Sequence, residues 1–370
     1  NGSLSSFVTT TGNAGGGGGS GWQNGTLDLD YDLVIAANGT FSAPRGTVSL
    51  VRNLQNSGTF THNSGTFEAV SGDNTLINTT GTAPITFHNF TYSGGAFTQI
   101  YRDTTVENAL TISTGHFKLN NSSNAVTLTI GTATAAGSIV NNGTLSVDNS
   151  GTNKPTVQGA SSLYPAVCTG TDWDWNANSA ADWKLANLDY QIALVTGSGS
   201  ASEKITLTGD CEFDAVTVSS GYTLDFNGQR AVIGGDFTCT GGGTPAALDW
   251  EDSLVIIKGH VNLNGIITTA NSGTKIIHDT ASEKNWSSLY ADAGVFMSNG
   301  SQTTLTNYGW TSSGNEVTTI IPAATINTNN VNINTTNMTI PTGGTFQGQA
   351  QTLTCAGDFT TSGGLIGKSA

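Results

Sequence analysis

The chain has 370 residues, only 10% of them charged, and 12 Lys and Arg residues against 26 Asp and Glu give it a net charge of −14. This balance argues against a nucleic-acid partner, because a phosphate backbone requires a basic face. Hydrophobic residues reach 36% and alternate regularly with polar ones, which argues against disorder. Helix formers are scarce, so we expect an all-β fold. No apolar run approaches the roughly 18 residues that cross a membrane, so no membrane insertion is expected.

Residues 1–25 form a Gly-rich leading segment. Gly15 to Gly19 is a run of five glycines, which is typical of a flexible joint or a loop at the end of a fold. The chain opens at Asn1 rather than at Met, so we expect a mature or excised segment of a longer protein.

An acidic strand is predicted next, at residues 27–33, where apolar residues and aspartates alternate strictly. Asp28, Asp30 and Asp32 share one face, and their spacing could offer carboxylates to Ca²⁺. The interpretation that we favour is a solvated outer face, with Tyr31 and the leucines facing inward. We therefore predict no metal site and no cofactor.

One strand-turn unit recurs at residues 110–115, 216–221 and 338–343. Each copy has an apolar residue, Thr, a second apolar residue, two small polar or turn residues, and then Gly. Period-2 alternation ended by Gly predicts a short strand closed by a turn that needs a permissive backbone. We expect the two apolar residues of each copy to face inward and the Thr between them to face outward.

Repetition of this kind without helical segments between the copies predicts a solenoid, whose coils cover one another's apolar faces. The expected fold is an elongated right-handed parallel β-helix, or β-solenoid, in two stacked sections. The first section is predicted at 26–165 and the second at 166–370, with an irregular excursion near 285–312.

The predicted boundary precedes a Trp-rich window that holds three of the seven tryptophans. Its candidate binding residues are Asp172, Trp173, Asp174, Trp175, Asp182 and Trp183. Aromatic platforms beside carboxylates are typical of sugar-binding clefts, and two carboxylates about 5–10 Å apart could hydrolyse a glycoside. We favour a third interpretation, in which the tryptophans cap the open end of the second section. No catalytic residue is assigned.

The cysteines and histidines show no motif. Four cysteines are too few for a disulfide framework in this length, and none lies in a CxxC pair that would indicate zinc. Cys211 and Cys239 lie about one coil apart and could form a disulfide only if they stack, whereas Cys355 is expected to be free and buried. The five histidines share no ligand spacing.

Two stretches carry a resemblance to known proteins. Residues 58–67, Gly-Thr-Phe-Thr-His-Asn-Ser-Gly-Thr-Phe, and the strand-turn units resemble the repetitive right-handed β-helix segments of phage fibre or tail proteins and of bacterial adhesin-like surface proteins. The Trp-rich window and residues 211–218 are similar to the start of such coils in bacterial adhesin-like proteins. These families vary widely, so the resemblance implies a fold and assigns no functional residue.

The resemblance implies a structural fibre or appendage protein of a virion or cell surface, extracellular and not an enzyme, that gives reach and display for attachment. Its expected partners are other structural subunits of the fibre, in an oligomer, with a surface glycan as a further candidate. Two alternatives stay open. One is a tailspike-like β-helix protein that binds or degrades polysaccharide, which a clustered acidic groove would favour. The other is an S-layer or filament subunit, which polymerisation of the isolated chain would favour.

Overall fold

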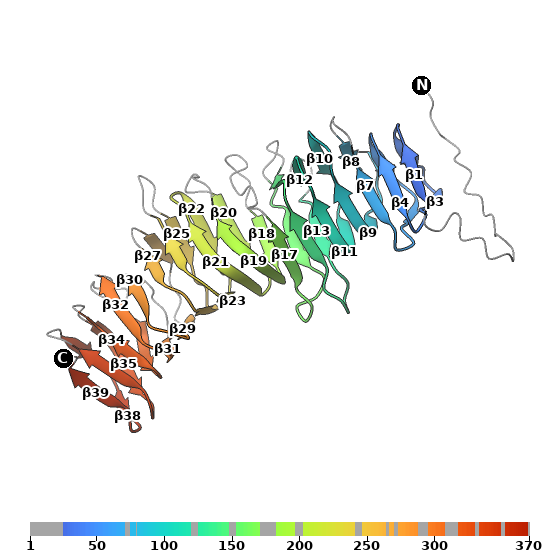
Figure 1. Ribbon diagram of the computed structural model, residues 1–370. Coiled ribbons are helices and arrows are strands. Elements are labelled where there is room, and N and C mark those ends of the chain that lie inside the picture. Colours follow the sequence, from blue (N-terminus) through green and yellow to red (C-terminus); the bar gives the residue numbers. More distant parts are fainter. Residues whose placement is uncertain are drawn as a thin grey trace. The chain divides into compact units, whose positions relative to one another are not determined.

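The computed structural model is all-β and forms a β-solenoid of parallel strands stacked about 21 residues apart (Figure 1). Among the described residues no helix could cross a membrane. The structure describes residues 25–70, 75–78, 80–119, 125–147, 153–170, 183–196, 203–240, 246–263, 266–269, 273–287, 295–307, 317–329, 333–348 and 352–368.

The chain divides into two compact units, Asn1–Asp189 and Tyr190–Ala370. Residue 165, where the sequence analysis places the end of the first section, falls inside the first unit. The strands just after it continue the ladders of that unit.

The described strands of the first unit form three long parallel ladders, in which strands of successive coils lie side by side. The first ladder comprises β1 (Thr26–Leu29), β4 (Thr47–Leu50), β7 (Thr66–Ala69), β9 (Ile85–Tyr92), β11 (Thr104–Ile112), β14 (Ser138–Asn141) and β17 (Ala166–Gly170). The second comprises β2 (Leu33–Ile35), β5 (Leu54–Asn56), β8 (Thr75–Ile77), β10 (Phe97–Ile100), β12 (His116–Leu119) and β15 (Thr144–Val147). The third comprises the first halves of β9 and β11, β13 (Thr127–Ile130), β16 (Thr156–Gly159) and β18 (Trp183–Ala186), while β3 (Thr40–Ser42) and β6 (Thr59–Thr61) form a separate two-stranded parallel sheet.

Strands β9 and β11 are long because each turns a corner between the third ladder and the first. The register of the pair shifts between Val106 and Ala109. There, two residues of β11 lie opposite a single residue of β9. An extra residue of this kind bends a strand and redirects its side chains. The corner therefore sets where His88 and Glu107, which lie beside the shift, point.

Aromatic rings from successive coils fill the interior of the first unit. Phe67, Phe87, Phe90 and Phe117 are all buried. The Phe87 and Phe90 rings stack with centroids 4.8 Å apart, and Phe90 meets Phe117 edge-on at 5.6 Å. Full burial of such a side chain is worth about 1.5–3 kcal/mol, so these rings contribute to the stability of the first unit.

The second unit is also built from parallel ladders. One comprises β20 (Glu203–Leu207), β22 (Tyr222–Asp225), β25 (Ala246–Asp249) and β28 (Ile266–Thr269). Another comprises β21 (Cys211–Val218), β23 (Arg230–Ile233), β26 (Leu254–Ile257), β29 (Lys275–Thr280), β31 (Val295–Gly300), β33 (Val317–Pro322), β35 (Ile333–Ile340), β37 (Leu353–Cys355) and β38 (Phe359–Thr361). The last comprises the second half of β21, β24 (Phe237–Cys239), β27 (Val261–Leu263), β30 (Lys284–Ser287), β32 (Thr303–Asn307), β34 (Thr325–Asn327), β36 (Thr345–Gly348) and β39 (Leu365–Lys368). Strand β19 (Leu188–Val195), most of which belongs to this unit, neighbours β21.

The repeated strand-turn unit has the predicted register. Its apolar residues Leu110, Ile112, Val216, Val218, Met338 and Ile340 are all buried. The Thr residue between each pair is partly exposed. The closing glycines have positive φ, 66° at Gly115, 83° at Gly221 and 84° at Gly343. The prediction from alternation and glycine is confirmed at all three copies.

Two predictions about the cysteines are settled by the ladders. Cys211 pairs with Ala231 and Cys239 pairs with Val218, so the two cysteines lie in different ladders, do not stack and form no disulfide. Cys355 is a free thiol, as predicted, but it is half-buried rather than buried. Strands β38 and β39, in the same last coil of the described chain, also expose apolar side chains such as Leu365.

Within 285–312, the predicted irregular excursion, the described residues continue the solenoid. Strands β31 and β32 lie there, with all but the first residue of β30, and each pairs with a strand of a preceding coil. Trp286, at the start of the segment, is fully buried. Residues 288–294 and 308–312 lie outside the described part of the chain.

Candidate functional site

Most of the Trp-rich window lies outside the described residues. This holds for Asp172, Trp173, Asp174, Trp175 and Asp182, so the proposed platform as a whole remains a prediction. Trp183 is described: it is the first residue of β18 and its side chain is fully buried in the interior. Its ring therefore offers no open face on which a sugar could stack.

Asp28, Asp30 and Asp32 are exposed, as the favoured interpretation of a solvated face requires. They do not belong to either of the groups of described side chains that lie close enough to share an ion. Asp32 instead accepts hydrogen bonds from the backbone N–H and the side chain of Asn53, at 3.0 and 3.1 Å, which links two successive coils. The predicted inward position of Tyr31 is wrong: it is 61% exposed, and the Arg52 guanidinium lies 5.7 Å from its ring centroid.

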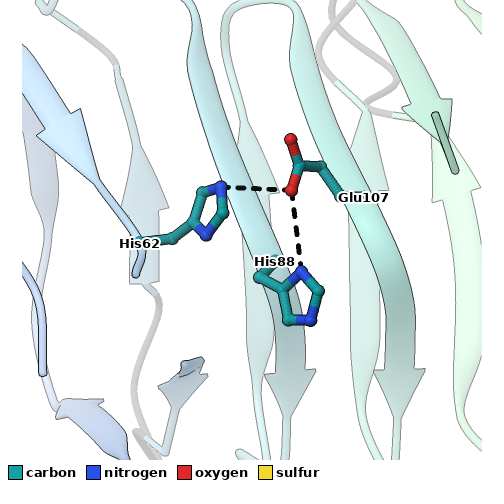
Figure 2. A group of neighbouring side chains, drawn as sticks. All are labelled: His62, His88 and Glu107. Carbon is teal, nitrogen blue, oxygen red and sulfur yellow. Dashed lines mark ion pairs between the residues drawn. The ribbon is translucent and has the colours of Figure 1, made fainter. Parts of the chain in front are cut away.

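The structure brings together three other side chains, His62, His88 and Glu107, which we call the two-histidine cluster (Figure 2). Both imidazoles point at the same carboxylate oxygen. His62 Nε2 lies 3.2 Å from Glu107 Oε2, and His88 Nδ1 lies 3.6 Å from it. The two rings stack with centroids 5.6 Å apart and planes 18° apart.

Three successive coils supply the cluster at one corner of the first unit. His62 follows β6, His88 lies in β9 and Glu107 lies in β11. Each of the three residues follows shortly after a residue that points inward. Two of the inward residues are Phe60 and Phe87, whose ring centroids lie 5.4 Å apart. The inward residues thus fix the coils in register, while the corner turns the polar side chains outward.

Hydrogen bonds assign the proton of His62. The backbone N–H of Ser64 donates to His62 Nδ1 at 3.0 Å, so that nitrogen carries a lone pair. In the neutral ring the proton then sits on Nε2 and is directed at Glu107. His88 Nδ1 is shielded from solvent and makes no hydrogen bond.

The sequence shows no ligand spacing among the histidines, yet the structure places two of them beside one carboxylate. His88 follows His62 by 26 residues and Glu107 follows His88 by 19, and neither spacing matches a ligand motif. Each coil supplies one residue of the cluster, and the number of residues in a coil varies with the length of its corners. The signal available in the sequence was an apolar residue shortly before each cluster residue: Phe60, then Phe87, then Val106.

A hollow beside the two-histidine cluster is too narrow to admit a water molecule. Aromatic side chains close it from the inside, among them Phe60, Phe67 and Phe87. The cluster therefore lies on the outer face of the coil and not at the bottom of a substrate pocket. Two imidazole nitrogens and a carboxylate oxygen can share a proton or ligate a metal ion there.

A second group in the other unit contains Lys204, Asp225, Asp249 and Glu251. Asp225 and Asp249 are direct partners in adjacent strands. Lys204 Nζ lies 2.7 Å from Asp225 Oδ2 and 3.8 Å from Asp249 Oδ2. The Asp225 side chain is nearly buried and also accepts a hydrogen bond from the Asn227 backbone at 2.8 Å.

Charge governs the protonation of this second group. Burial lowers the pKa of Lys204, but the hydrogen bond and the charge of Asp225 outweigh it, with help from Asp249 and Glu251, and the pKa is raised overall. The negative charges of Asp225 and Asp249 raise the pKa of Glu251. The ammonium group already occupies the space between the carboxylates, so the group is best described as a structural ion pair.

Comparison with family models, with curated proteins and with solved structures finds no match for this chain.

Proposed function

We propose that this protein is a structural fibre or appendage protein of a virion or cell surface, which gives reach and display for attachment. The observation that carries the proposal is the succession of parallel ladders in each unit, with apolar residues stacked inside coil after coil. Each coil of such a fold is stabilised by its neighbours, so length can be added without a new core. That property suits a protein whose task is to span a distance.

The outer rows of the ladders support the same proposal. In the third ladder of the first unit, Thr86, Thr105 and Thr129 are successive partners across three coils. Gln158 continues the row and donates from its side chain to Thr129 Oγ1 at 3.2 Å. Rows of uncharged polar side chains make a regular surface, and the acidic net charge discourages sideways aggregation.

The partners proposed are other structural subunits of the same fibre, in an oligomer, with a surface glycan as a candidate receptor. Immunogold electron microscopy of intact cells or virus particles, with an antibody raised against the purified chain, tests the proposal. Labelling of external fibres supports it, with an antibody to a cytoplasmic protein as the control. Label confined to the cell interior would contradict it.

Experiments on the purified chain distinguish this proposal from the two alternative functions. A subunit of a layer or filament should assemble by itself, which sedimentation velocity of the purified chain would detect. A polysaccharide-degrading protein should release reducing ends from capsule or wall polysaccharide. Loss of that release on replacing Asp172, Asp174 or Asp182 would replace the structural proposal with the enzymatic one.

A further inference from the structure

We propose that the two-histidine cluster is a binding site for a divalent transition-metal ion, and that Zn²⁺ fits it best. The ligand atoms are His62 Nε2, His88 Nδ1 and Glu107 Oε2 (Figure 2). This proposal is independent of the fibre function, because it concerns one corner of the first unit and a property that can be measured on the purified chain.

The distances match a tetrahedral site. Bonds of about 2.0–2.2 Å from zinc to imidazole nitrogen or carboxylate oxygen place neighbouring ligand atoms of a tetrahedron about 3.3–3.6 Å apart. The two histidine-to-Glu107 distances are 3.2 and 3.6 Å. All three ligand atoms lie within 4.8 Å of one another, close enough to share one ion.

The donor atoms select the class of metal. Ca²⁺ and Mg²⁺ take oxygen ligands almost exclusively, whereas imidazole nitrogen favours zinc and its neighbours in the transition series. Two neutral imidazoles and one carboxylate leave a net charge of +1 around Zn²⁺. The side chains are 23%, 29% and 33% exposed, so a fourth, solvent-facing position is open to water.

His88 supplies an independent sign of a missing ligand. Its Nδ1 is shielded from solvent and makes no hydrogen bond. A shielded polar atom without a hydrogen bond is costly, and native structures contain few of them. The nitrogen faces Glu107 Oε2 at 3.6 Å, beyond hydrogen-bond reach. A metal ion between the two atoms would give it a partner, once the ring proton of His88 sits on Nε2.

Ser64 determines what must change when the ion binds. A neutral imidazole has a single lone pair, and His62 now uses it at Nδ1 to accept from the Ser64 N–H. Ligation by Nε2 requires the ring proton to move from Nε2 to Nδ1, with no net proton release. The Ser64 N–H then loses its acceptor and must donate to water instead. Ser64 is exposed in the turn after His62, so water can reach it.

A bound ion would tie three successive coils together, because its ligands come from β9, β11 and the turn after β6. Ligands that bind only the folded state raise the melting temperature by mass action. We therefore expect Zn²⁺ to raise the melting temperature of the first unit.

Isothermal titration calorimetry of the chelator-treated full chain with Zn²⁺ tests the proposal, with Co²⁺ absorption as a report on tetrahedral geometry. The wild-type chain should bind one ion at the cluster. His88→Ala and Glu107→Gln should each weaken Zn²⁺ binding by more than about 10-fold. Losses of about 10–100-fold are typical even for residues that only hold a metal ligand in position. His116→Ala, which alters a histidine outside the cluster, is the matched control and should bind as wild type does.

Circular dichroism of each variant establishes that it folds, and His62→Gln provides a further variant if His88→Ala does not. The absence of Zn²⁺ binding to the wild-type chain would overturn the proposal. Unchanged binding in folded His88→Ala and Glu107→Gln, or an equal loss in His116→Ala, would also overturn it. In those cases the three side chains only contact one another and bind no metal ion.

Discussion

Phe226 and Trp250 stack one coil apart, with ring centroids 4.9 Å and ring planes 5° from each other. Each ring precedes a two-residue turn in which both residues have positive φ. The first turn is Asn227–Gly228, at 47° and 71°, and the second is Glu251–Asp252, at 33° and 56°. Asn and Gly adopt this backbone readily, but Glu does so at a cost. The buried stack therefore holds the second turn in a conformation that its own sequence disfavours.

Trp250→Ala should lower the free energy of unfolding by about 3–5 kcal/mol, because it leaves a large cavity beneath a strained turn. Trp250→Phe keeps a ring against Phe226 and should lose much less. Urea denaturation followed by circular dichroism measures both. Equal losses in the two variants would show that the stack does not hold the turn.

The register of β21 gives a sharp contrast between adjacent positions. Val218 is buried and Thr217 points outward from the same strand. Val218→Asp puts a carboxylate into an apolar interior and should unfold or aggregate the second unit. Thr217→Asp should be within about 0.5 kcal/mol of wild type, as other surface changes are. Soluble yield and thermal melting compare them, and similar behaviour of the two would refute the assigned register.

The alternation and the closing glycines were predictable because both are local. A buried Leu110 next to a partly exposed Thr111, or a positive φ at Gly115, depends on a few residues that the sequence displays together. The two-histidine cluster was not predictable in the same way. Its spacing depends on corner lengths and on the register shift in β11, which no local pattern shows.

Trp250 and Cys355 show the other limit of local patterns. An acidic run such as Asp249 to Asp252 predicts an exposed turn, yet Trp250 within it is fully buried because the neighbouring coil presents Phe226. Cys355 is at an inward-type position of the repeat, yet it is half-buried. What covers a residue in a solenoid is set by the adjacent coils, and single-strand patterns do not contain that information.

Cys355 should be the most reactive of the four thiols. Cys168, Cys211 and Cys239 are buried, and burial raises the pKa of the Cys239 thiol so that little reactive thiolate forms. Cys355 is only half-buried, although its sulfur lies 3.3 Å from the Thr336 carbonyl oxygen. Labelling of the native chain with a maleimide, read by mass spectrometry, should modify Cys355 first, and Cys355→Ser should abolish the rapid phase. Rapid labelling of Cys239 without denaturant would contradict this order.

Lys204 should be needed to keep Asp225 in its buried position. Lys204→Met leaves that carboxylate beside Asp249 without a cation and should cost about 2–3 kcal/mol. This is below the cost of breaking a fully buried pair, because the Lys204 side chain is 31% exposed. The raised pKa of Lys204 means that the stabilisation is present at neutral pH and is lost only as alkaline pH passes through that pKa. Lys258→Met, at an exposed lysine of the same unit, is the control for urea denaturation, and equal effects of the two changes would contradict the role of the pair.

His278 should make the second unit sensitive to acid. Its ring is buried and fully hydrogen-bonded in the neutral form: Nε2 donates to the Gly259 carbonyl at 2.9 Å, and Nδ1 lies 2.8 Å from Thr303 Oγ1, which donates to it. Burial lowers the pKa of His278 to about 4, while the Gly259 hydrogen bond partly opposes the shift.

Because the folded-state pKa lies below the ordinary value of about 6.5, the unfolded chain binds more protons between the two values. The stabilisation from neutral His278 is therefore complete above pH 6.5 and is lost as the pH falls towards 4, by roughly 3 kcal/mol in all. His278→Gln removes the titrating group and should flatten this part of the stability profile, measured by urea denaturation at intervals from pH 7 to pH 4. His260→Gln, at an exposed neighbouring histidine, is the matched control. An unchanged slope in His278→Gln would show that the acid sensitivity arises elsewhere.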